Sequence, residues 1–293
     1  MIAVDVAQHR QFFADELDAV CAFQTPGLAS AFADVPRERF LPPGPWDVLS
    51  MSDYTPCAAP APRPTADADP RRVYHNIGIA IDRSRSLFNG HPGTLASWID
   101  TLGLAPGTRV LHIGTGLGYY TAIMAHVVGP SGRVVGIEVD EPLAVAARAN
   151  LASMPWVDVR HGDGASLGGD TFDAILVNAG VTHPLDEWLD ALPVGGRLVL
   201  PLTVAMAPTL GKGFMMLLTR LVDGSCAVKP FGVVAVYSAL GLRDVALNAA
   251  LGEAMRKQPW PPVTRLRRDE HQPTTTCWLH GPRCCFGHEP QPR

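Results

Sequence analysis

A glycine-rich turn between an apolar segment and a helix-forming segment holds the residues best suited to binding a ligand. Gly114, Gly116 and Gly118 follow the apolar run 110–113 and precede residues 119–128, which contain neither Gly nor Pro. Glycine lets the backbone turn sharply and lets a ligand lie against the main chain. Free N–H groups at a helix start favour a negative or strongly polar ligand group. The pattern predicts a strand, a ligand-binding turn and a helix, and a tight turn without a ligand is the alternative.

Two acidic residues follow at positions where a nucleoside could be bound. Glu138 lies in a second apolar segment, 133–140, twenty residues after Gly118. A carboxylate at that strand end can accept hydrogen bonds from both hydroxyls of a ribose. Asp163 lies between two glycines after a short third strand, 157–160, where a carboxylate can accept from the exocyclic amine of adenine. The glycine spacing is G-x-G-x-G, whereas the dinucleotide fingerprint is G-x-G-x-x-G, which argues against a nicotinamide cofactor.

Further apolar segments complete the predicted sheet. Residues 172–177 and 196–202 predict a fourth and a fifth strand, and the five strands alternate with helical stretches, as in an open, mostly parallel sheet. Ligands of such sheets bind at the carboxyl ends of the strands. Two apolar runs, 214–221 and 228–237, flank the turn 223–225 and predict an antiparallel hairpin. We therefore expect an α/β protein with a Rossmann-like, mostly parallel sheet, an antiparallel C-terminal hairpin, N-terminal helices and a C-terminal extension.

The flanking segments predict further helices and one long loop. Residues 57–72 are rich in Pro, Ala and Asp and predict a loop, which is either a surface insertion or a cover over the site. Apolar residues at helical spacing predict helices over residues 6–23, 28–32, 94–102 and 243–257. We expect three parts: an N-terminal helical and lid or substrate region, a ligand-binding domain and a C-terminal extension, over residues 1–92, 93–240 and 241–293.

Four motifs together resemble the S-adenosylmethionine-dependent methyltransferases, and more narrowly the protein-L-isoaspartate O-methyltransferase group. They are residues 111–119 (Leu-His-Ile-Gly-Thr-Gly-Leu-Gly-Tyr), 161–164 (His-Gly-Asp-Gly), 172–177 (Phe-Asp-Ala-Ile-Leu-Val) and 195–201 (Gly-Gly-Arg-Leu-Val-Leu-Pro). The resemblance extends over residues 35–237. It implies S-adenosyl-L-methionine as the cofactor, with His112, Gly114, Thr115, Gly116, Gly118, Glu138, Asp163, Gly164 and Asn178 as cofactor-binding residues.

The resemblance also implies a methyl acceptor, the carboxylate of an aspartate or isoaspartate in a peptide or protein. It points to Asn178 and His183 as catalytic candidates, because the loop after the fourth strand faces the transferable methyl in this architecture, and to His91, which lies in the segment that matches the family's acceptor-side junction. In the isoaspartyl group the residues before the preceding helix are Ser-Gln-Pro, and the serine hydroxyl contacts the reacting carboxylate. The matching residues here are Gly90, His91 and Pro92. The missing serine favours a specialised substrate, such as an aspartate of a modified peptide, over general repair.

Two other positions and two other functions stay open. The isoaspartyl group usually has Glu at the position of His112, where the acid helps hold the methionine ammonium. Either backbone carbonyls near Gly114 hold that amine here, or His112 is a buried, hydrogen-bonded side chain. For Arg37, within a Val-Pro-Arg-Glu segment that also resembles the group, a structural role is favoured. A non-catalytic cofactor-binding module and an NAD-dependent oxidoreductase are the alternative functions.

The composition limits the protein's class and partners. The chain has 293 residues, of which 47% are hydrophobic and 18% charged, and its formal net charge is -4. This composition supports a sizeable core and gives no general attraction to nucleic acid or to anionic membranes. No apolar run approaches the ~20 residues of a membrane span, and residues 1–11 lack a signal-peptide pattern. We expect a cytoplasmic protein with a peptide or protein substrate and no nucleic-acid or membrane partner, and its oligomeric state stays open.

The C-terminal tail is rich in potential metal ligands. The six cysteines of the chain do not form a disulfide-framework pattern. Zinc prefers four nitrogen or sulfur ligands in a tetrahedron, but the spacing Cys277-x-x-His280-x-x-x-Cys284 matches no established motif, and residues 274–279 equally predict an edge strand. We therefore expect no metal. The tail's ligands are His271, Cys277, His280, Cys284, Cys285 and His288.

Overall fold

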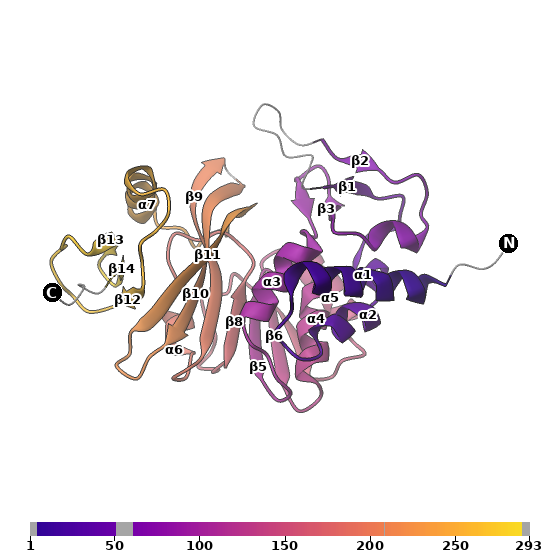
Figure 1. Cartoon of the computed structure of the whole chain (residues 1–293), viewed down its shortest axis with the longest axis horizontal. Helices are drawn as coiled ribbons and strands as arrows, with labels where there is room; N and C mark the ends of the chain where they lie inside the picture. The colour runs from indigo at the N-terminus through magenta and orange to yellow at the C-terminus, as the bar shows by residue number, and fades with distance from the viewer. Residues whose placement is uncertain (1–4, 51–60, 208, 289–293) are drawn as a thin grey trace. The chain divides into compact units, whose positions relative to one another are not determined.

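The structure, a computed structural model, describes residues 5–50, 61–207 and 209–288. Contacts within the chain divide it into two compact units (Figure 1). Unit 1 comprises Met1–Thr108 and Thr115–His161, and unit 2 comprises Arg109–Gly114 and Gly162–Arg293. These units are defined by contacts, whereas the three parts expected from the sequence follow motifs, and those three parts remain a prediction.

Unit 1 begins with the helices expected from the apolar spacing. Helix α1 (Val6–Cys21) is capped by Asp5, whose side chain accepts a hydrogen bond from the N–H of Ala7, and α2 is Leu28–Asp34. Phe13 of α1 and Phe32 of α2 are fully buried and pack edge to face, with ring centroids 6.1 Å apart. Burying an aromatic side chain stabilises the fold by about 1.5–3 kcal/mol. Helix α3 (Pro92–Thr101) begins at a proline, which suits the first turn of a helix.

A small antiparallel sheet and two short 3-10 helices in unit 1 were not predicted. The sheet has the order β2-β1-β3-β4, and its strands are only two to five residues long. Such short strands carry too few residues to show an alternating pattern. The bounds are Arg63–Pro64 for β2, Asp47–Leu49 for β1, Gly78–Asp82 for β3 and Leu87–Phe88 for β4, with 3-10 helices at Arg37–Phe40 and Pro70–Val73.

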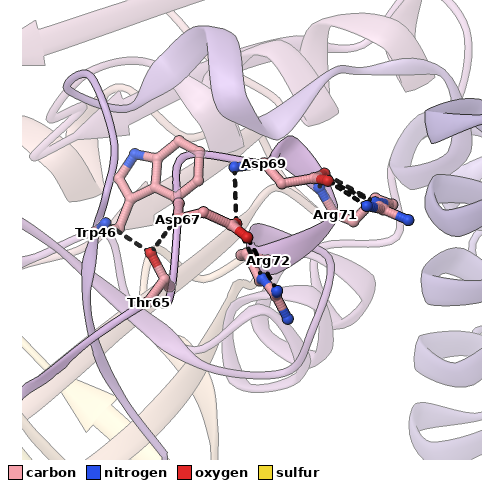
Figure 2. A network of polar contacts seen from close by, with 6 residues as sticks. All are labelled: Trp46, Thr65, Asp67, Asp69, Arg71 and Arg72. Carbon is pink, nitrogen blue, oxygen red and sulfur yellow. Dashed lines mark hydrogen bonds and ion pairs between the residues drawn. The ribbon is translucent and has the colours of Figure 1, made fainter.

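The predicted loop 57–72 is described from residue 61 onward, and Cys57 lies outside the described residues. Figure 2 shows the polar network that holds this part of the chain. The N–H of Trp46 donates to Thr65 Oγ1 over 2.9 Å, and that hydroxyl donates to the carbonyl of Asp67 over 2.8 Å. Arg72 pairs with Asp67 at 3.1 Å, and Arg71 pairs with Asp69. Exposed ion pairs contribute only ~0–1 kcal/mol each, so the strand pairing and the hydrogen bonds fix this loop.

Unit 1 also holds part of the parallel sheet. Strand β6 (Arg133–Glu138) pairs in parallel with β7 (Val157–His161), and helix α5 (Glu141–Asn150) connects them. Helix α4 (Tyr119–Val128) is almost entirely buried. Strands β6 and β7 and helix α4 coincide with predicted segments, and α5 is one of the helical stretches expected between the strands. Strand β6, which is buried from its second residue onward, appears in the sequence as an apolar run.

Unit 2 begins with three parallel strands. Strand β5 (Arg109–Ile113) pairs with β8 (Ala174–Val177), and β8 pairs with β9 (Arg197–Ala207). The short helix α6 (Asp186–Asp190) lies between β8 and β9 in the chain. Residues 110–113 of β5 and every residue of β8 are buried. The carboxyl ends of β5 and β8 are therefore held in fixed register, with Ile113 opposite Val177.

The rest of unit 2 extends this sheet with antiparallel strands, in the order β13-β14-β12-β11-β10-β9-β8-β5 (Figure 1). The predicted hairpin is confirmed as β10 (Leu210–Arg220) and β11 (Cys226–Tyr237). The predicted fold class is confirmed, although the antiparallel part is larger than the single hairpin expected. The C-terminal extension adds β12 (Arg265–Arg267), β13 (Cys277–Gly281), β14 (Cys284–Gly287) and helix α7 (Val245–Lys257). Among the described residues, no helix is long and apolar enough to span a bilayer.

Candidate active site

In unit 1, the carboxylate of Glu138 fixes the glycine-rich turn. Glu138 ends β6 and is 7% exposed. Its Oε2 accepts a hydrogen bond from the N–H of Gly116 over 2.7 Å, and its Oε1 accepts one from the N–H of Asp140 over 3.1 Å. An ionised carboxylate offers about four lone-pair positions. Two of these are used by the backbone, so each oxygen retains capacity for one hydroxyl of a ribose.

The other unit 1 residues of the turn are positioned by backbone geometry and packing. Gly118 has a φ of +96°, and a Cβ on it would lie 2.9 Å from Leu151 Cδ1. Thr115 is 5% exposed, and its N–H donates to the carbonyl of Ile137 over 3.3 Å. Unit 1 thus brings Thr115, Gly116, Gly118 and Glu138 together, as the sequence predicts.

In unit 2, two glycines surround the end of β5. The N–H of Asn178 donates to the carbonyl of Ile113 over 2.8 Å, and a Cβ on Gly114 would lie 3.3 Å from the Asn178 carbonyl oxygen. A Cβ on Gly164 would lie 3.1 Å from Ile113 Cγ2. The carbonyl of Gly164 accepts a hydrogen bond from Trp188 Nε1 over 2.8 Å. Unit 2 therefore brings Gly114, Gly164 and Asn178 together around the end of β5.

Asp163 lies in an exposed turn directly before Gly164. Its Oδ1 accepts a hydrogen bond from the N–H of Ala165 over 2.9 Å. This bond orients the carboxyl group, as Asp side chains do in turns. Within the described part of the chain, Oδ2 has no hydrogen-bond partner that would occupy it. The carboxylate can therefore accept a hydrogen bond from a ligand amine.

The buried imidazole of His112 is uncharged. His112 is fully buried in β5, opposite Leu176 of β8. Burial lowers its pKa from 6.5 to about 3, because an ion cannot keep its hydration shell there. A neutral imidazole carries no negative charge that could attract an ammonium group. Of the two readings of this position, the buried side chain is the one that the structure favours.

His183 follows β8 and is held by a hydroxyl group. Thr182 Oγ1 lies 2.9 Å from His183 Nδ1 and accepts a hydrogen bond from the N–H of Asp244 over 3.0 Å. A hydroxyl group can both donate and accept, so this contact orients the ring at Nδ1 without fixing its tautomer. Burial lowers the pKa of His183, and the charges of Asp244 and Asp186 oppose that shift. The lowered pKa favours the uncharged ring at neutral pH.

Arg37 organises the segment that carries His91, a role that sequence reasoning identified only as structural. Its guanidinium is fully buried and donates to the carbonyls of Val73 and Ile77 over 2.7 and 2.8 Å. It also donates to Asn89 Oδ1 and to the carbonyl of Gly90, each over 3.4 Å. The only sequence feature that could have indicated a buried role for Arg37 is its place between the apolar residues of segment 35–40. Its many backbone partners are distant in sequence and could not be predicted.

The backbone at the position of the missing serine is suited to glycine. Gly90 has a φ of +80°, and a Cβ there would lie 3.0 Å from Leu95 Cδ2. Next to it, His91 forms the N-cap position of α3, and its ring packs over Gly78 of β3, where a Cβ would lie 3.5 Å from His91 Nε2. A Cβ on Gly116 would lie 3.8 Å from Ile81 Cδ1, also in β3. Strand β3 thus contacts both His91 and the glycine-rich turn.

These features fit S-adenosylmethionine. A fixed acidic side chain ends β6, and the turn before α4 has a positive φ at Gly118 that favours glycine. Together with the parallel strands they define the class: an S-adenosylmethionine-dependent methyltransferase. Residues 65–233 match the family model described as "Protein-L-isoaspartate(D-aspartate) O-methyltransferase (PCMT)". The chain belongs to this family, and the nicotinamide-dependent alternative has no support.

Two relatives agree with this assignment. Protein-L-isoaspartate O-methyltransferase 2 from Polaromonas sp. (strain JS666) is 33% identical over 180 residues, which cover 59% of this chain and 79% of the relative. Protein-L-isoaspartate O-methyltransferase from Yersinia pestis (strain Pestoides F) is 37% identical over 149 residues, covering 49% of this chain and 69% of the relative.

Two solved structures share the fold. A protein-L-isoaspartate O-methyltransferase has a TM-score of 0.64 and 20% identity, and the match covers 96% of this chain and 88% of that one. A Plasmodium falciparum structure in complex with S-adenosyl-L-homocysteine has a TM-score of 0.56 and 16% identity, and the match covers 78% of this chain and 97% of that one.

Proposed function

We propose that this methyltransferase transfers a methyl group to a carboxylate oxygen of a peptide or protein, forming a methyl ester. The names of the matched relatives point to isoaspartyl side chains as the first class of acceptor to test. An aspartyl side chain of a modified peptide is the second class, because Gly90 stands where the family serine is expected. His91, Asn178 and His183 are the proposed acceptor-side residues.

The cofactor residues have separate proposed roles. S-adenosylmethionine, when bound, supplies an electrophilic methyl group on a sulfonium. Glu138 accepts the ribose hydroxyls, and Asp163 accepts the adenine amine. Gly114, Gly116 and Gly118 allow the backbone to approach the cofactor closely. Glycine-specific backbone at all three positions, with φ of +82°, +57° and +96°, supports this assignment.

The hydrogen-bonding state of His183 is the observation that supports a carboxylate acceptor. A carboxylate is already ionised at neutral pH and needs no general base, whereas an amine or hydroxyl has to lose a proton. We propose that the Thr182 hydroxyl donates to His183 Nδ1, which lies 2.9 Å away, so that Nε2 carries the ring proton. A neutral N–H donor can orient a carboxylate oxygen without removing its nucleophilic charge. Holding the two reactants in line supplies most of the remaining rate enhancement.

Exclusion of water also favours this acceptor. A carboxylate and a sulfonium neutralise each other during methyl transfer, and water stabilises the separated charges more than the transition state. Uncharged groups on the chain therefore suit the reaction. His112 and His183 both have pKa values lowered by burial and add no charge at neutral pH.

The direct test uses methyl-labelled S-adenosylmethionine with two peptides that differ only in one residue, isoaspartate or aspartate. We expect labelled product that releases volatile methanol at alkaline pH, because methyl esters hydrolyse there and methylamines do not. Label that withstands alkali on either peptide contradicts the proposal. Tight cofactor binding in calorimetry without transfer to either peptide favours the alternative of a binding module.

The histidine role has its own matched pair of variants. His183→Gln keeps an N–H donor, and His183→Ala removes it. We expect the Gln variant to retain at least tenfold more methyl-transfer activity than the Ala variant, with the cofactor affinity of both unchanged. Equal activities contradict a donor role.

A further inference from the structure

Four side chains near the C-terminus of unit 2 converge on one point. His271, Cys277, His280 and Cys285 each place one ligand atom so that all four atoms lie within 4.8 Å of one another. Two imidazole nitrogens and two sulfurs form a donor set typical of structural zinc. We propose that these four residues bind a single zinc ion in tetrahedral geometry. This site is separate from the residues assigned to methyl transfer.

Strand pairing explains how the two cysteines and His280 reach the same face. His280 of β13 lies directly opposite Cys285 of β14, so the two side chains share one face of the sheet. Cys277 lies three residues before His280, and regular alternation would place it on the other face. A register shift between Cys277 and Leu279 adds one residue to β13 and brings Cys277 back.

The fourth ligand comes from the loop after β12. His271 Nδ1 lies 2.9 Å from the carbonyl of Asp269, so Nδ1 carries the proton that it donates. Nε2 then has its lone pair available, and it lies 3.7 Å from Cys277 Sγ. Zinc–sulfur and zinc–nitrogen bonds of about 2.3 and 2.0–2.1 Å at a tetrahedral angle separate the two ligand atoms by ~3.6 Å. A carbonyl that fixes the second nitrogen is the usual support of a histidine ligand.

A second observation points independently to a missing ligand. The Nδ1 of His280 is buried, and no described residue gives it a hydrogen bond. Buried polar atoms are rarely left unpaired. The rings of His271 and His280 meet edge to face with centroids 4.8 Å apart, and Cys277 Sγ accepts a hydrogen bond from the N–H of Thr274 over 3.3 Å. A metal ion would satisfy the histidine and bind the supported sulfur.

The site would join three short strands and the loop between two of them. Strands β12, β13 and β14 contain three, five and four residues. Zinc would tie the loop carrying His271 to both strands of the β13–β14 pair. Four protein ligands fill a tetrahedron, which indicates a structural ion with no open position. Cys277 and Cys285 also line a cavity of about 1030 Å³, through which the ion can enter.

The first test measures metal content and cobalt spectra on the full-length chain under reducing conditions. We expect one zinc per chain by mass spectrometry of the digested protein. Replacing zinc with cobalt should give the visible absorption of tetrahedral cobalt and a sulfur-to-cobalt charge-transfer band. A chain that binds neither zinc nor tetrahedral cobalt after reconstitution overturns the proposal. These readouts do not depend on methyl transfer, so the two proposals fail separately.

Neighbouring cysteines provide a matched control. Cys284 and Cys285 are adjacent in β14 and both buried, but alternation places Cys284 on the opposite face. We expect Cys285→Ser to lower the bound zinc at least fivefold and Cys284→Ser to retain one zinc per chain. Cys277→Ser, at a less buried position, should also lose zinc while S-adenosylmethionine affinity is retained, which shows that the variant is folded. Full zinc occupancy in Cys285→Ser or Cys277→Ser overturns the assignment.

Discussion

The buried histidine of β5 should make the stability of the protein depend steeply on pH. In the unfolded chain the pKa of His112 is about 6.5, whereas burial lowers it to about 3 in the folded protein. Above pH 6.5 the imidazole is neutral in both states. Below it the unfolded chain takes up a proton that the folded protein cannot accept, so the free energy of unfolding decreases as the pH falls.

The size of the effect follows from these two values. Protonation of His112 in the unfolded chain lowers the free energy of unfolding by about 2 kcal/mol at pH 5. This decrease grows to ~4 kcal/mol near pH 3. Because the folded-state pKa lies well below 5, the value at pH 5 depends almost entirely on the unfolded chain. A decrease of 2 kcal/mol is a large fraction of the 5–15 kcal/mol stability typical of proteins.

Urea unfolding at pH 8 and pH 5, followed by tryptophan fluorescence, measures this difference. His112→Asn removes the titrating group. We expect the free energy of unfolding of this variant to decrease between pH 8 and pH 5 by about 2 kcal/mol less than that of the original protein. The matched control is His161→Asn, at an exposed position of β7, which leaves His112 in place and should keep the full loss. If His112→Asn and the original protein lose stability equally, the reasoning is wrong.

The remaining predictions concern the cofactor residues and the segment that carries His91. Asp163→Ala should weaken S-adenosylmethionine binding by roughly 1–3 kcal/mol in calorimetry, because a polar contact is lost, and an unchanged affinity would remove Asp163 from the site. Gly90→Ser should cost about 1–2 kcal/mol in urea unfolding, because φ is positive there, and an unchanged stability would contradict this backbone assignment. Arg37→Met should cost about 1–3 kcal/mol or more, because several buried carbonyls lose their donor; a stability change below this range would show that the network is not important.

The parallel strands and their helices could be predicted because local patterns determine them. Strand β8 is buried throughout and appears in the sequence as an uninterrupted apolar run. The hairpin of β10 and β11 is marked by the turn residues 223–225 between two apolar segments. The proximity of the glycine-rich turn to Glu138 could be predicted because their spacing matches a strand–turn–helix unit followed by a second strand.

Other features depend on contacts between residues far apart in the sequence. Arg37 reaches backbone carbonyls around residues 73–77 and 90, and no local pattern encodes these partners. The grouping of the four proposed zinc ligands depends on an irregularity in strand pairing. The irregularity at Trp278 brings Cys277 to the face of Cys285, and the sequence spacing of the tail, which matched no established motif, could not show this.

The central claim is that Glu138 and the glycine-rich turn bind S-adenosylmethionine for transfer to a carboxylate. The most direct measurement is the initial rate of base-labile methyl transfer to an isoaspartyl peptide at low cofactor concentration, by the original protein and by Glu138→Ala. We predict ester formation by the original protein and a rate at least tenfold lower for the variant. Equal rates in the two proteins, or no ester above the blank without enzyme, would contradict the claim.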